Sequence, residues 1–148
     1  LGIRCDLPFN DIIKHFQSLG GDVILLNPEY VCGRDHLLTS VIHAERALRH
    51  GTNRSKTLLT ETILYAAGER QISRALAKMR PGEGCTELAA VVFDVDDLRL
   101  DIIGAAVDND IIKCTKEKAE RLGLSVSAGV PYDDLALEMV AMVDIQKQ

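Results

Sequence analysis

Two short apolar runs, separated by a long stretch of helical periodicity, constrain the fold of this chain more than any other feature. The runs lie at residues 22–27 and 87–94 and are bounded by turn residues, a pattern typical of buried strands. Between them, from residue 35 to 79, apolar residues recur every three or four positions, as in amphipathic helices. Strands that flank a helical middle segment predict an α+β fold, with a small sheet of about four strands packed with helices.

The rest of the chain supplies further elements for such a fold. Asn10 is the expected N-cap of the first helix, and Gly20, Gly51 and Gly68 are expected helix ends. The third helix opens at either Ser55 or Thr57. Neither a repeat nor a linker is evident, so we expect a single domain over residues 1–148. The expected elements are a strand at 2–5, helices at 10–19, 35–50, 57–67, 69–79 and 131–146, short helices at 96–100 and 115–122, and ambiguous segments at 102–107 and 111–113.

Size and cysteine usage bound the class of protein. A chain of 148 residues buries roughly 70% of its unfolded surface, which is enough for one core without covalent staples. Its apolar runs are far shorter than the roughly 20 residues of a membrane span, and its opening residues predict no secretory signal. Cys5, Cys32, Cys85 and Cys114 show no C-x-x-C spacing. We therefore expect free, mostly buried thiols in a cytoplasmic protein.

Charge is concentrated in one segment. The chain has a net charge of −5, which argues against nonspecific coating of nucleic acid. Residues 45–80 nevertheless contain eight basic and only three acidic residues. Within it, Arg70, Arg74 and Lys78 are spaced to lie on one face of the helix expected at 69–79. This segment suggests a local anionic partner, although the charge alone favours a solvated helix face.

Motifs for catalysis or metal binding are not evident. The acidic segments 94–97 and 108–110 lack the glycine and glutamate that complete a calcium loop. Cys32 and His36 are four residues apart and could form a thiol–imidazole pair, which keeps an enzyme as a minor alternative. His36, His43 and His50 recur every seven residues, too far apart for one metal ion. They form either a weakly polar helix face or contacts to an RNA. We expect no cofactor, no metal and no enzymatic activity.

A family resemblance rests on two segments, residues 34–46 and 55–77. The most specific part is Ala-Gly-Glu-Arg-Gln-Ile at residues 67–72, followed by Ala75. These segments resemble the small accessory (Cgi-type) subunit of the KEOPS complex, the family of the PRPK-binding protein TPRKB. The resemblance extends over nearly the whole chain and is strongest from His36 to Met79.

The resemblance implies a function that spacing alone does not reveal. KEOPS makes the threonylcarbamoyl modification of the adenosine next to the tRNA anticodon, and its catalytic subunit is a different protein. The resembled subunit has no activity of its own. It binds the Bud-type kinase/ATPase subunit and helps to recruit tRNA through the 3′ CCA end. The alternative is an adaptor that regulates a kinase by protein contact and does not bind RNA.

The candidate binding residues follow from charge and from this resemblance. Arg70, Arg74 and Lys78 can contact phosphates, and Gln71 can read a base edge. His36 and Lys56 are expected to flank them. On the helix at 131–146, Met139 and Met142 are expected to contact the kinase, because methionine suits adaptable apolar contacts. Core packing of both methionines is an equally good interpretation.

Overall fold

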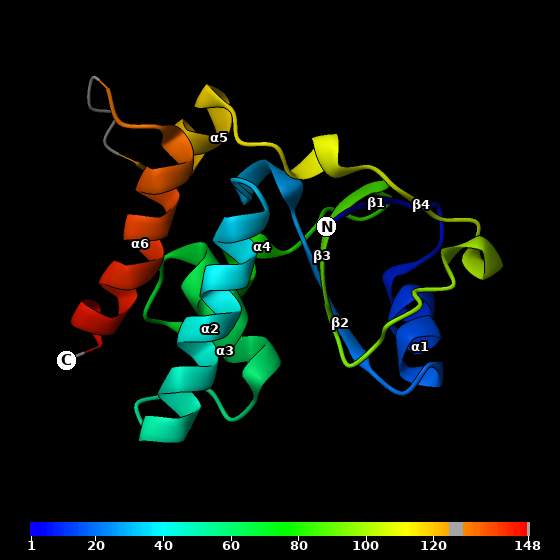
Figure 1. Ribbon diagram of the computed structural model, residues 1–148, viewed down its shortest axis with the longest axis horizontal. Helices are drawn as coiled ribbons and strands as arrows, with labels where there is room; N and C mark the ends of the chain where they lie inside the picture. The colour runs from blue at the N-terminus through cyan, green and yellow to red at the C-terminus, as the bar shows by residue number, and fades with distance from the viewer. Residues whose placement is uncertain (125–128, 148) are drawn as a thin grey trace. The chain divides into compact units, whose positions relative to one another are not determined.

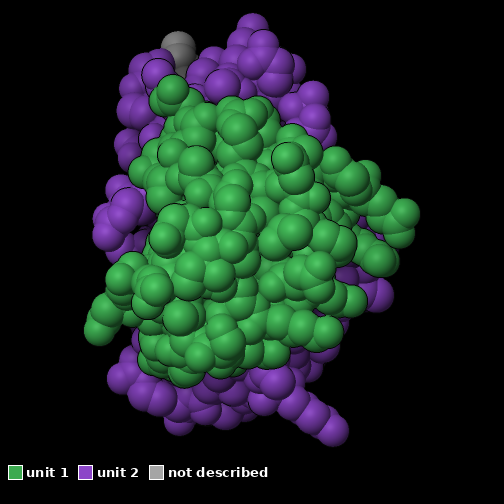
Figure 2. All heavy atoms as spheres, turned by 90° about the vertical axis from the view of Figure 1, so that its right-hand side faces the viewer, with its two compact units in different colours: residues 1–28, 80–112 green, residues 29–79, 113–148 purple. Residues whose placement is uncertain are grey.

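The computed structural model describes residues 1–124 and 129–147, and its strands and helices form the α+β fold expected from the sequence (Figure 1). The chain divides into two compact units, which Figure 2 distinguishes by colour. Unit 1 comprises Leu1–Pro28 and Arg80–Ile112, and unit 2 comprises Glu29–Met79 and Lys113–Gln148. The single domain expected from the sequence stays a prediction.

Unit 1 contains the sheet. Its described strands are β1 (Gly2–Arg4), β2 (Asp22–Leu26), β3 (Glu87–Phe93) and β4 (Ala106–Val107). They lie in the order β2-β3-β1-β4, and every neighbouring pair is antiparallel. The two apolar runs that predicted buried strands are thus hydrogen-bonded neighbours, with Ile24 opposite Val91.

A first core lies between the sheet and helix α1 (Phe9–Ser18). Ile12 and Phe16, one turn apart on α1, are fully buried, and each contributes about 1.5–3 kcal/mol through removal of its side chain from water. The buried apolar residues that they meet are Ile3, Cys5, Val23, Leu88 and Ala90. The helix begins one residue earlier than expected, because Pro8 is its N-cap and Asn10 lies inside the first turn.

Unit 2 is built from helices. They are α2 (Arg34–His50), α3 (Leu58–Ala67), α4 (Ile72–Met79), α5 (Lys116–Arg121) and α6 (Tyr132–Gln146). Helix α2 packs against α3 and α6, and Figure 1 shows α6 beside it. Gly51 and Gly68 end α2 and α3 in left-handed conformations, as expected. Thr57, rather than Ser55, caps α3, because its hydroxyl accepts a hydrogen bond from the Thr60 N–H.

Several elements differ from those expected. Residues 96–99 form no helix, since Arg99 is left-handed at φ 47° and its N–H bonds the Asp97 carboxylate, a local bond that competes with helix formation. The ambiguous segments become the 3₁₀ turns η2 (Leu100–Ile103) and η3 (Asn109–Ile112) and strand β4. A further 3₁₀ turn, η1 (Pro28–Tyr30), lies in the loop before α2. Helix α4 begins at residue 72 rather than 69.

Candidate nucleic-acid and partner interface

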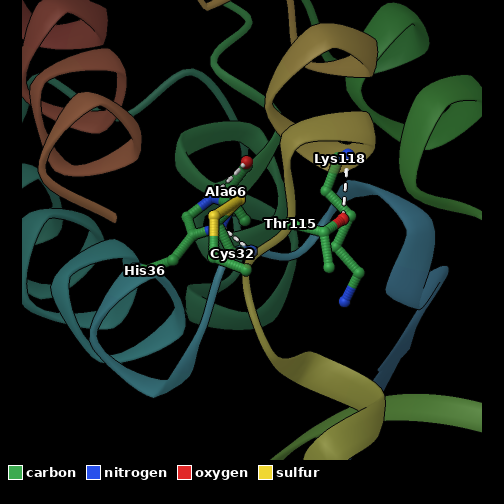
Figure 3. Close-up of a disulfide and its surroundings, with 6 residues drawn as sticks. Cys32, His36, Ala66, Thr115 and Lys118 are labelled. Carbon is green, nitrogen blue, oxygen red and sulfur yellow. Dashed lines mark hydrogen bonds between the residues drawn. A yellow bond between two sulfur atoms is a disulfide. The ribbon is translucent and has the colours of Figure 1, made fainter. Parts of the chain in front are cut away.

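His36 lies in the interior of unit 2 rather than at its surface. Its Nδ1 accepts a hydrogen bond from the Cys32 N–H at 2.9 Å, and its Nε2 lies 2.8 Å from the Ala66 carbonyl oxygen (Figure 3). A carbonyl can only accept, so Nε2 carries the proton and the ring is neutral. Burial lowers the pKa of His36 to about 4. The ring is 0% exposed and offers an RNA no surface, so the site does not include His36.

Cys32 forms a disulfide with Cys114, which ties the loop before α2 to the loop before α5 (Figure 3). The expectation of a free thiol is wrong for these two residues, whereas Cys5 and Cys85 are free. The sequence concealed the pair because its members are 82 residues apart. A disulfide-bonded Cys32 has no thiol, so the Cys32–His36 catalytic pair is not formed in this structure.

The turn between α3 and α4 contains the most specific part of the family segment. Gly68 has φ +68°, and a Cβ there would lie 2.6 Å from Cγ of Met139. Glycine is therefore required both by the backbone and by the approach of α6. Arg70 and Gln71 are the last residues of this turn and precede the first residue of α4. The continuous helical stripe expected for Arg70, Arg74 and Lys78 is consequently not formed.

The basic residues of this region differ in how far they are already engaged. Lys78 donates to the Ala67 carbonyl at 2.9 Å and pairs with Glu69 at 3.0 Å. Arg70 is exposed and makes a long contact of 3.5 Å to the Gln146 carbonyl oxygen. Arg74 and Lys56 are exposed and form no ion pair with any acidic residue in the described part of the chain. With exposed Gln71, they remain accessible to an anionic partner.

A buried ion pair joins α3 to the end of α6. Lys147 Nζ lies 2.5 Å from Oε1 of Glu61, and the two side chains are only 4% and 0% exposed. Glu61 also accepts hydrogen bonds from the N–H groups of Arg54 and Ser55 and from the Ser55 hydroxyl. Burial raises the pKa of Glu61, but the hydrogen bond from Lys147 and those from Ser55 and Arg54 outweigh it, so the pKa is lowered and the group is an anion.

The ion pair extends into a polar network that reaches α2. Lys147 Nζ donates to the Tyr65 hydroxyl at 2.9 Å, and this hydroxyl donates to Asp144. Asp144 also lies 2.8 Å from Nδ1 of His43. Burial acts to raise the pKa of Asp144, but its bonds to Tyr65 and His43 leave the pKa lowered. Burial, followed by the bond to Asp144, raises the pKa of Tyr65. Three helices are thereby held together at one end of the unit.

A cavity of about 470 Å³ opens at the ends of α2 and α6. No motif marked it in the sequence, and the only signal was the excess of basic residues in the segment 45–80. Basic side chains are prominent on its walls. The lining residues are Arg46, Ala47, His50, Gly51, Thr52, Asn53, Arg54, Asp144 and Lys147.

The two methionines border a second hollow, of about 370 Å³, beside α6. Met142 is 45% exposed. Met139 is partly buried and packs against a small core that contains Cys32, Leu122 and Ala136. The structure thus brings both residues to one groove but gives them different roles, because Met139 also belongs to the interior.

Within residues 1–124 and 129–147, no group of three or more His, Cys, Asp or Glu side chains is placed to hold a metal ion. In that part of the chain, no helix combines the length and the apolar character that crossing a membrane requires.

Comparison with known proteins identifies the family. A search of curated proteins found no match. The family model described as "Kinase binding protein CGI-121" matches residues 10–133, which is most of the chain. This match confirms the Cgi-type family expected from the segment at 67–72. The chain therefore belongs to the CGI-121 family of kinase-binding proteins.

Proposed function

We propose that this chain is the non-catalytic accessory subunit of a cytoplasmic KEOPS complex. In this role it binds the Bud-type kinase/ATPase subunit and recruits tRNA through its 3′ CCA end. The observation that carries the proposal is the family match over residues 10–133, whose description names kinase binding. The turn at residues 68–71 leaves Arg70 and Gln71 exposed, which supports tRNA as the second partner.

The groove beside α6 is the best candidate for the kinase contact. Met142, which lines this groove on α6, is 45% exposed. Large apolar side chains that remain exposed at a groove are typical of protein interfaces. The partner is taken to be a kinase because the family description names one.

Changing Met142 to aspartate is expected to weaken binding to a Bud-type kinase by about tenfold or more, because a charge would replace a buried apolar contact. Isothermal titration calorimetry measures the effect. Ile102→Asp is the matched control, since Ile102 is 60% exposed in unit 1 and lies outside this groove. Equal affinities for Met142→Asp and the unaltered chain would place the kinase elsewhere. Met139→Asp is unsuitable because Met139 packs into the interior.

A substitution at Arg74 tests RNA recruitment most directly. Changing Arg74 to glutamate is expected to weaken tRNA binding by about tenfold, since one phosphate contact is lost and a repulsive charge takes its place. Folding should be unaffected because Arg74 is exposed. Removal of the CCA nucleotides from the tRNA should weaken binding to the unaltered chain more than binding to the variant, because the substitution and the removal abolish the same contact.

Gel shift at two salt concentrations measures this effect. Lys14→Glu on α1 is the control, because it makes the same charge change at an exposed position outside the basic segment. If Arg74→Glu and Lys14→Glu weaken binding equally, only net charge matters and the proposed RNA surface is misplaced. If the unaltered chain does not bind tRNA at all, the result supports the alternative function, that of an adaptor that regulates a kinase without binding RNA. The net charge of −5 and the internal bonds of Lys78 favour that alternative.

A further inference from the structure

The cavity at the ends of α2 and α6 is lined by more basic side chains than neighbouring acidic side chains neutralise. Lys147 on its wall is neutralised by Glu61 behind it. Asp144, the acidic residue of the wall, is held by His43 and by the Tyr65 hydroxyl. Glu61 and Asp144 are thus already engaged by neighbouring side chains.

The two arginines of the wall have no such neutralisation. Neither Arg46 nor Arg54 forms an ion pair with an acidic residue in the ranges 1–124 and 129–147. Arg54 donates one guanidinium N–H to the Lys147 carbonyl, which fixes its position at the end of α6. Both residues are exposed, and His50 lines the cavity one turn after Arg46 on α2. Two arginines and a histidine therefore line one hollow.

The chemistry of these donors selects the ligand. Guanidinium groups bind carboxylate and phosphate through paired N–H donors. A carboxylate carries one charge and is satisfied by one arginine, whereas a phosphate offers more oxygens and more charge to two arginines and a histidine. The volume of about 470 Å³ lies within the range of about 300–1,000 Å³ of small-ligand sites, so a phosphate can be accommodated with an attached nucleoside.

We propose that this cavity is a phosphate-binding site that takes the phosphate group of a nucleotide, with Arg46 and Arg54 as its principal ligands. The phosphate belongs to a free nucleotide or to an RNA chain. The site uses residues other than those proposed for tRNA at the start of α4. With a free nucleotide as ligand it is independent of the proposed function, and with an RNA phosphate it rests on the tRNA binding proposed above.

Charge reversal at Arg46 tests the site, with Arg49 as the matched control. Both arginines are exposed on α2, three residues apart, and only Arg46 lines the cavity. Inorganic phosphate and adenosine 5′-monophosphate are titrated by calorimetry, and tRNA is titrated by gel shift. Arg46→Glu is expected to weaken the binding of at least one probe by about tenfold, while Arg49→Glu changes it by less than about threefold. If Arg46→Glu unfolds, Arg46→Gln replaces it.

The probes distinguish the sources of the phosphate. Loss of binding of the small probes in Arg46→Glu supports the site with a free nucleotide as ligand. Loss confined to tRNA supports it with an RNA phosphate as ligand. The proposal is overturned if none of the probes binds the unaltered chain, or if Arg46 and Arg49 variants bind every probe alike. In that case the arginines only offset the negative ends of α2 and α6, and thermal unfolding would show a loss of stability without a loss of binding.

Discussion

Replacing Glu61 with alanine is expected to lower the free energy of unfolding by about 3–5 kcal/mol, the usual cost of removing one partner of a buried ion pair. The substitution leaves the Lys147 ammonium group in the interior, 4% exposed and without its counter-charge. It also leaves the N–H groups of Arg54 and Ser55 without their acceptor. Urea unfolding followed by circular dichroism measures the loss.

Glu69→Ala is the matched control for this prediction. Glu69 also pairs with a lysine, Lys78, but both side chains are about a quarter exposed. Water screens such a pair, so the control should cost no more than about 1 kcal/mol. A loss below about 1 kcal/mol for Glu61→Ala would show that Lys147 reaches water without this partner, and the buried network would then not hold α6 in place.

Lowering the pH from 6.5 to about 4 is expected to destabilise the chain by about 3 kcal/mol through His36 alone. The pKa of this histidine is about 6.5 in the unfolded chain and about 4 in the folded one. Between these values only the unfolded state binds the proton. The contribution of His36 is therefore complete above pH 6.5 and is lost as the pH falls toward 4.

The variant His36→Asn separates this effect from other titrations. Asparagine does not titrate, so the variant should lack most of the pH dependence of unfolding between pH 6.5 and 4.5. Glu61 and Asp144, whose pKa values are lowered in the folded chain, lose their contributions below this window. An equal slope in the variant and the unaltered chain would mean that His36 binds its proton equally well in the folded and the unfolded chain, which would contradict its burial and the bond that its Nδ1 accepts from Cys32.

Local chemistry made part of this fold predictable. The apolar runs became β2 and β3, because four to seven apolar residues between turns suit a buried strand and little else. Gly51 and Gly68 ended α2 and α3 because glycine readily adopts the left-handed conformation. The start of α4 was misplaced because a helical period cannot reveal that residues 68–71 form a turn.

Long-range pairing was the part that sequence did not reveal. Lys147 forms an ion pair with Glu61, 86 residues away in the sequence, and Cys32 forms a disulfide with Cys114, 82 residues away. Nothing local marks either pair. His36 was misassigned for a related reason, because a histidine at the start of a helix has the same local pattern whether its nitrogens meet water or buried backbone groups. The cavity beside Arg46 likewise depends on α6, which is distant in sequence.

Sedimentation of the chain with a Bud-type kinase and fluorescent tRNA tests the central claim most directly. As an accessory subunit that holds both partners, the chain is predicted to join them in one species, and tRNA lacking its CCA end should be largely absent from that species. If the chain and the kinase form a species that does not contain intact tRNA, the chain is a kinase-binding adaptor and does not recruit tRNA. If the chain sediments as a separate species although folded kinase and tRNA are both present, the proposed function is contradicted altogether.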